Sequence, residues 1–180
     1  EVVRVANPNI ILMAWIDVSE IGDNPILQMN YNRMRDNLHI LETSTDQDGR
    51  PFKIIKVPMP NLVVKSVIAR NKMDKYSHPL DVLTGGFIPS EAPSAGDTLL
   101  RLATSSYLNF IVTNGVVILP TYLSMGTSLE KETQVKHIFE TQFPNHEIVF
   151  VNVMPLNWKG GGLHCSTMEQ PSPPKYYTGP

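Results

Sequence analysis

The sequence predicts an α/β fold in which a strand–strand–helix–strand unit occurs twice. Two turn signals support this: apolar runs meet at Asn7-Pro8-Asn9 in the first unit and at Asn114-Gly115 in the second. An Asn-Gly pair between apolar runs is the strongest short hairpin signal. A segment with helical spacing and a further apolar run follow each hairpin. Because such a unit cannot bury both faces alone, the pattern predicts a repeat architecture with further copies beside these two.

The first unit is expected over residues 1–68. Strands over residues 2–6 and 10–16 flank its turn, and Asp23 and Pro25 are suited to the cap and first turn of the helix that follows. The apolar face of this helix is expected to hold Ile26, Leu27, Met34, Leu38 and Leu41. A polar turn at 48–51 then leads to a third strand over 52–57.

The second unit is expected over residues 99–171, with strands at 107–113, 116–120 and 147–151. Ser128 is the expected helix cap, and the acidic residues Glu130 and Glu132 suit the positive end of the helix dipole. The apolar face of the helix is expected to comprise Val135, Ile138 and Phe139, with Leu129 as a further candidate.

Residues 69–98 link the two units and show little periodicity. A loop of this length is either functional or a surface insertion, and both interpretations remain open for the segment around Gly85-Gly86-Phe87. The proline-rich residues 172–180 are expected to form an extended terminal strap.

Composition places the chain among ordinary globular domains. It has 180 residues, is 42% apolar and 18% charged, and carries a net charge of −2, so neither a nucleic-acid nor a membrane partner is indicated. The longest apolar runs are too short to span a bilayer. A single cysteine excludes an intrachain disulfide and favours a reducing, cytoplasmic location. The spacing of the histidines and the lone thiol do not predict a metal site.

Residues 160–171 are the most informative for function, because they hold the single cysteine, Cys165. Three glycines precede it and leave the backbone open to close approach, as a nucleophilic thiolate requires. His164 could assist the sulfur only if it faced it, and neighbours in a strand point to opposite faces. A small buried core residue is an equally good interpretation of a lone cysteine.

Other polar residues are weaker candidates. Asn109 falls inside the expected strand 107–113, where asparagine is disfavoured, so it either bonds a neighbouring strand or orients a substrate or catalytic group. Asp17 ends the expected strand 10–16 and either contributes a carboxylate or begins a loop. His39 and His137 are expected on the solvated faces of helices, and His146 in a turn. His78, beside Pro79 in the long loop, is either functional or a surface residue.

The residues GGGLHCSTMEQP at 160–171 resemble the nucleophile motif of agmatine deiminases and of the bacterial type of peptidylarginine deiminase. The resemblance extends to 105–110 with 114–120, to Phe143-Pro144, to 9–15 and to the turn 48–50, and it is least clear over 69–94. It implies the pentein fold, a propeller of five strand–strand–helix–strand modules, of which this chain would supply about the last two.

The resemblance implies that Cys165 attacks a guanidinium carbon, that ammonia leaves, and that water hydrolyses the thiouronium intermediate. Asn109 is expected to be a second catalytic residue beside the cysteine. Gly161, Gly162 and His164 are expected to contact the substrate. No cofactor is implied. The expected substrate is a small guanidino compound, agmatine first, which would give N-carbamoylputrescine on a route to putrescine.

In the family, carboxylates hold the guanidinium, and the histidine that transfers protons comes from a His-x-Asp-Glu motif, whose last residue Glu1 matches. The resemblance therefore implies that the catalytic histidine and aspartate precede Glu1 and that residues 1–180 alone are inactive. The expected partners are the N-terminal part of the same domain and, in a homodimer, a second copy. Residues 166–170 depart from the usual agmatine deiminase motif. The open alternatives are peptidylarginine or free arginine deiminase, an amidinotransferase, and a non-catalytic pentein binding protein.

Overall fold

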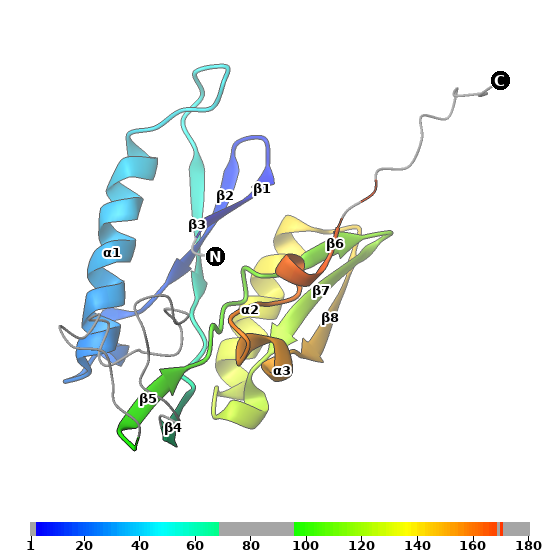
Figure 1. The fold of residues 1–180 in the computed structure, drawn as a ribbon. Coiled ribbons are helices and arrows are strands. Elements are labelled where there is room, and N and C mark those ends of the chain that lie inside the picture. Colours follow the sequence, from blue (N-terminus) through cyan, green and yellow to red (C-terminus); the bar gives the residue numbers. More distant parts are fainter. Residues whose placement is uncertain (1–2, 69–95, 169, 171–180) are drawn as a thin grey trace.

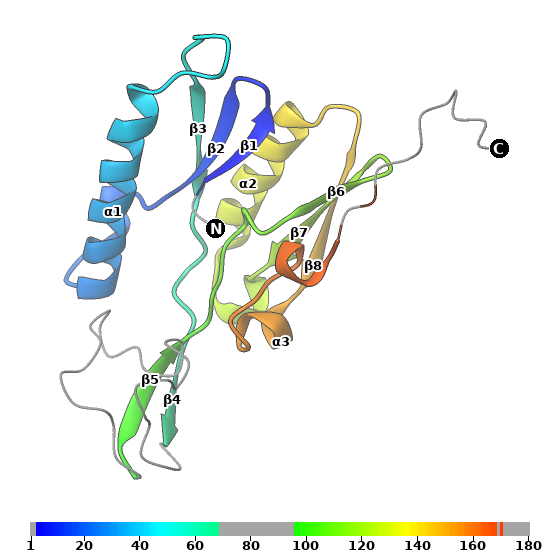
Figure 2. The ribbon, with the colours of Figure 1, turned by 45° about the horizontal axis from the view of Figure 1, so that its top comes forward.

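The computed structural model describes residues 3–68, 96–168 and 170. These residues form two three-stranded sheets and one two-stranded hairpin (Figure 1). The first sheet and its helix stand apart from the second sheet in both ribbon views, and helix α2 lies between them (Figure 2). The predictions on the loop around Gly85-Gly86-Phe87, on His78 and on the terminal strap fall outside the described residues.

The first unit contains β1 (Val3–Asn7), β2 (Ile10–Trp15), α1 (Pro25–Glu42) and β3 (Lys53–Pro58). Strand β2 is central, antiparallel to β1 and parallel to β3. The predicted helix is confirmed, but its cap is Asn24, whose side-chain oxygen accepts from the backbone N–H groups of Ile26 and Leu27. Asp23 is not the cap because Pro25 occupies the first helical position, and the cap is the residue directly before it.

The second unit repeats this order with β6 (Ile111–Thr113), β7 (Val116–Thr121), α2 (Leu129–Gln142) and β8 (Glu147–Asn152). Strand β7 is central, antiparallel to β6 and parallel to β8. Asn114 and Gly115 both have positive φ, as the predicted two-residue turn requires. The duplicated unit is thus confirmed, while its place in a five-module propeller stays a prediction.

The predicted strand over 107–113 begins only at Ile111. Residues 107–109 instead form a buried turn, in which the Ser106 hydroxyl accepts from Leu108 N–H and the Ser106 carbonyl accepts from Asn109 N–H. Serine and asparagine offer the backbone such local partners, which compete with strand pairing. Asn109 therefore lies in a turn and not in a strand.

A hairpin that the sequence did not predict joins the two units. Its strands β4 (Val64–Ile68) and β5 (Thr98–Leu102) pair antiparallel, with Val64 opposite Leu102. The chain from 69 to 95, which lies outside the described residues, connects them. The expected loop at 69–98 is therefore shorter than predicted at its C-terminal end.

One hydrophobic core runs through both units. Helix α2 contacts both β3 and β8, and its buried residues Val135 and Phe139 belong to one cluster with buried residues of both units. Phe110 packs edge-on against Phe139, with 4.8 Å between ring centroids. The candidate Leu129 is excluded from this core, because 69% of it is exposed.

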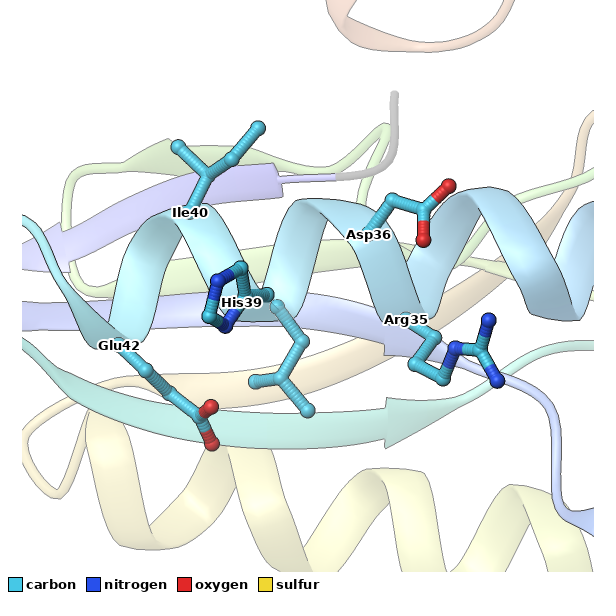
Figure 3. A pocket seen from close by; sticks show the side chains of 6 residues that line it. Arg35, Asp36, His39, Ile40 and Glu42 are labelled. Carbon is cyan, nitrogen blue, oxygen red and sulfur yellow. The ribbon is translucent and has the colours of Figure 1, made fainter.

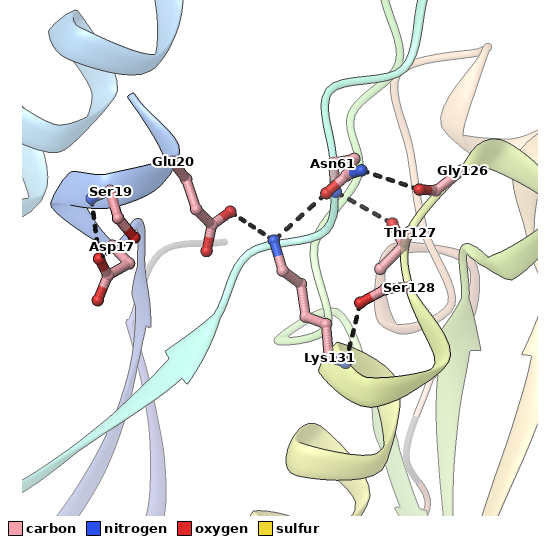
Figure 4. A network of polar contacts seen from close by, with 8 residues as sticks. All are labelled: Asp17, Ser19, Glu20, Asn61, Gly126, Thr127, Ser128 and Lys131. Atoms are coloured by element: carbon pink, nitrogen blue, oxygen red, sulfur yellow. Dashed lines mark hydrogen bonds and ion pairs between the residues drawn. The ribbon is translucent and has the colours of Figure 1, made fainter. Parts of the chain in front are cut away.

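Polar contacts also join the units at the start of α2 (Figure 4). Ser128 caps the helix as predicted by accepting from Lys131 N–H. The Lys131 ammonium pairs with Glu20 of the first unit and donates to the Asn61 side chain. Asn61 in turn bonds Thr127 and Gly126. In the part of the chain that the structure describes, no helix is both long and apolar enough to cross a membrane.

Candidate active site

Cys165 lies exposed in a single turn of 3₁₀ helix, His164–Ser166, that follows the glycine run. Ser166 stabilises this turn with two hydrogen bonds. Its N–H donates to the Leu163 carbonyl, and its hydroxyl donates to the Gly162 carbonyl. His164 and Cys165 therefore lie in a helical turn, and the alternation of neighbouring side chains in a strand does not apply to them. With about three residues per turn, adjacent side chains point roughly a third of a turn apart.

The Asn109 side chain reaches the cysteine directly. Its amide nitrogen donates to the Cys165 sulfur at 3.1 Å, and its oxygen accepts from the His164 N–H at 2.7 Å. The backbone donor identifies which end of the amide is oxygen, so the nitrogen must face the sulfur. A donor aimed at sulfur favours negative charge there, which is the reactive form of the thiol. The structure thus brings together the two residues predicted as catalytic.

Gly162 allows this contact. A Cβ atom at Gly162 would lie 2.5 Å from both Cγ and Oδ1 of Asn109, which no real side chain tolerates. The glycine run was expected to let another molecule approach the backbone closely. At Gly162 the group that approaches is the Asn109 side chain. The roles of Gly161, Gly162 and His164 in substrate contact stay predictions, although all three lie within four residues of Cys165 in the same loop.

The loop before the cysteine is anchored at Gly161. Its carbonyl accepts from the Asn157 side-chain amide at 2.9 Å and from the Thr104 hydroxyl at 3.3 Å. Asn157 is itself 2% exposed and ends the short helix α3 (Met154–Asn157). The loop before Cys165 is therefore tied to the segment that enters the Asn109 turn.

Arg4 of β1, in the first unit, contacts the turn that holds Asn109 in the second unit. Its guanidinium lies 4.0 Å over the centre of the Phe110 ring and donates to the carbonyls of Leu108 and Phe110. These two residues flank Asn109 in the chain. The start of β1 thus lies against the turn that carries Asn109. Sequence reasoning missed Arg4, since no local pattern marks a strand arginine as a contact to a distant turn.

The burial of Glu132 is the second feature that sequence reasoning missed, because the sequence assigned this residue only to the helix dipole. Glu132 is 4% exposed and accepts hydrogen bonds from the Tyr107 hydroxyl, the Thr121 hydroxyl and the Tyr122 N–H. Its spacing to Val135 and Phe139 would have revealed it, because residues three and seven positions apart share a helix face.

The other candidates lie apart from this site. Asp17 caps a short 3₁₀ turn by accepting from Ser19 N–H and hydroxyl, and these hydrogen bonds hold the pKa of its carboxyl below the usual value. His39 and His137 are exposed on helices as expected. A surface pocket along α1 includes His39 but is lined by that helix alone (Figure 3). Among the described residues, no cluster of histidine, cysteine or acidic side chains is arranged to hold a metal.

Comparison with known proteins bears on this arrangement. Residues 1–171 match the family described as Porphyromonas-type peptidyl-arginine deiminase. The chain belongs to this family. Agmatine deiminases of Pseudomonas fluorescens and of Pseudomonas aeruginosa are each 30% identical to it over 168 residues, 93% of this chain. The solved agmatine deiminase of Enterococcus faecalis is similar at 25% identity and a TM-score of 0.56, over 91% of this chain and 37% of that one.

The chain spans 38% of the length of the two curated Pseudomonas relatives. The recognised resemblance to the deiminase family is therefore confirmed, for part of the length of those proteins.

Proposed function

We propose that the full-length protein is a deiminase that hydrolyses a guanidinium group and releases ammonia, with Cys165 as its nucleophile. The observation that carries the proposal is the 3.1 Å hydrogen bond from the Asn109 amide to the exposed Cys165 sulfur. Membership of a deiminase family supports the reaction class. The similarity to agmatine deiminases supports agmatine as the first candidate substrate.

In the proposed reaction the Cys165 thiolate attacks the guanidinium carbon, so that a C–S bond forms. The C–N bond to one terminal nitrogen then breaks, and ammonia leaves with an added proton. Water next attacks the same carbon, the C–S bond breaks, and the sulfur leaves as thiolate. The product carries a urea group, which for agmatine is N-carbamoylputrescine. The Asn109 amide stabilises the sulfur as a thiolate, before it attacks in the first step and when it leaves in the second. The same hydrogen bond keeps the sulfur in one orientation.

The reaction also needs a proton donor for the leaving amine and carboxylates to hold the guanidinium. We propose that the histidine and aspartate implied by the family motif stand directly before β1 in the full-length protein. The contact between Arg4 and the Leu108 and Phe110 carbonyls supports this, because it sets the start of β1 beside Asn109. On this proposal residues 1–180 alone do not turn over substrate.

The matched family is named for peptidyl-arginine deiminase, which makes peptidyl-arginine the second candidate substrate. An ammonia-release assay on the full-length protein separates the two. We expect kcat/KM for agmatine to exceed that for free arginine and for a blocked peptidyl-arginine by about tenfold or more. Faster turnover of the peptide would establish the second candidate instead.

Two further outcomes of the same assay would indicate a different class of protein. Transfer of the amidino group to an added amine, in place of hydrolysis, would show an amidinotransferase. The absence of ammonia release from all three substrates, with folded protein, would contradict the proposal and favour a non-catalytic binding protein.

A further inference from the structure

The carboxylate of Glu132 is buried in the first turn of α2, on the face that carries Val135 and Phe139. A buried charge is destabilising unless hydrogen bonds compensate for the lost water. Here the Tyr107 hydroxyl donates at 3.1 Å, the Thr121 hydroxyl at 2.9 Å, and the Tyr122 N–H completes the set. The carboxylate therefore fixes both tyrosines at once.

The two tyrosines connect Glu132 to the turn that holds Asn109. The Tyr122 hydroxyl accepts from the Ser106 N–H at 2.9 Å, and the Ser106 hydroxyl accepts from the Leu108 N–H at 3.2 Å. Tyr107 lies between these residues in the chain and packs edge-on against Tyr122, with 5.3 Å between ring centroids. Residues 106–108 are thus held through Glu132, and Asn109 follows directly.

Both tyrosine hydroxyls keep their protons in this setting. Burial raises the pKa of Tyr122 to about 12, and burial together with the negative charge of Glu132 raises the pKa of Tyr107 further. At neutral pH Tyr107 therefore stays a donor to the carboxylate.

We propose that Glu132 is a positioning residue for the nucleophile, because it holds the 106–109 turn that aims the Asn109 amide at the Cys165 sulfur. Among the described residues its hydrogen bonds run to Tyr107, Thr121 and Tyr122, whereas the Cys165 sulfur is bonded by Asn109. The effect of Glu132 on turnover rests on the proposed function, whereas its effect on the thiol does not. A merely structural glutamate would change stability and leave the reactivity of Cys165 in the folded protein unchanged.

The test compares Glu132→Ala, Glu132→Gln and the control Glu130→Gln in the full-length protein. Glu130 is exposed in the same helical turn, so its substitution removes the same charge without touching the network. The probe is iodoacetamide, and the alkylation rate of the peptide that contains Cys165 is followed by mass spectrometry at fixed pH. Steady-state kcat and KM for ammonia release are measured in parallel.

We expect Glu132→Ala to lower the alkylation rate of Cys165 about tenfold and to lower kcat more than it raises KM, since small displacements at a reacting centre are costly. Glu132→Gln keeps one acceptor oxygen in the same shape and should restore both quantities to within about threefold. The control should match the unmodified protein. An unchanged alkylation rate in folded Glu132→Ala would overturn the proposal.

A milder variant covers the case in which Glu132→Ala does not fold. Tyr122→Phe keeps the ring and removes only the hydroxyl that contacts Ser106, so it should fold and lower the alkylation rate several-fold. An alkylation rate equal to that of the unmodified protein would then overturn the proposal. Should no guanidino substrate be turned over, the proposed function fails, while the alkylation measurement still decides the role of Glu132.

Discussion

Replacing Cys165 with alanine in the full-length protein should lower ammonia release at least about a thousandfold, because only the sulfur forms the bond to the guanidinium carbon. The side chain is exposed, so its loss should lower stability only by about 1 kcal/mol, for the hydrogen bond from Asn109. Ammonia release and thermal unfolding are the two measurements.

Met168→Ala is the matched control for this prediction. Met168 is 96% exposed and lies three residues beyond the cysteine, so this variant makes a similar truncation without removing the nucleophile. Turnover retained by Cys165→Ala at a level near that of Met168→Ala would end the claim that Cys165 is the nucleophile.

Gly162→Ala is expected to have the second largest effect. The added methyl group would lie 2.5 Å from Asn109, so the amide must move and lose its bonds to the Cys165 sulfur and the His164 N–H. We expect kcat to fall about a hundredfold and the free energy of unfolding to fall by about 1–3 kcal/mol. Steady-state kinetics and denaturant unfolding measure the two effects.

The neighbouring glycine provides the control for stability. A Cβ at Gly161 would meet only the Leu156 carbonyl, at 4.0 Å, which is an ordinary contact. Gly161→Ala should therefore leave unfolding and the alkylation of Cys165 unchanged, and any loss confined to KM would support the predicted substrate contact. Equal stability of the two variants would contradict the steric account of Gly162.

The repeated unit could be predicted because its signals are local. Asn114-Gly115 marks a turn by itself, and Ser128 caps a helix through a donor three residues away. The first helix cap was displaced by one residue, to Asn24, since Asp23 and Asn24 carry equally good acceptors and only the position of Pro25 decides between them. Strands β4 and β5 were missed because their pairing is long-range and no short turn announces it.

The candidate site, like the fold, could be predicted only where its signals are local in the sequence. The motif 160–171 identified Cys165, and the matching segment 105–110 identified Asn109, yet neither revealed that Asn109 lies in a turn. That turn depends on local bonds from Ser106 and on distant ones from Arg4, Tyr122 and Glu132. Contacts between residues so far apart in the chain arise from packing, and a single sequence carries no direct record of them.

The most direct test of the central claim is to trap the covalent intermediate on Cys165. The full-length protein is mixed with agmatine, quenched in acid during turnover and digested. The mass of the peptide that contains Cys165 is then measured by mass spectrometry. We expect a peptide heavier by the mass of the substrate less one ammonia, and we expect this peptide to be absent without substrate. Turnover at full rate with that peptide unmodified at every quench time, or with the adduct on another residue, would contradict the claim.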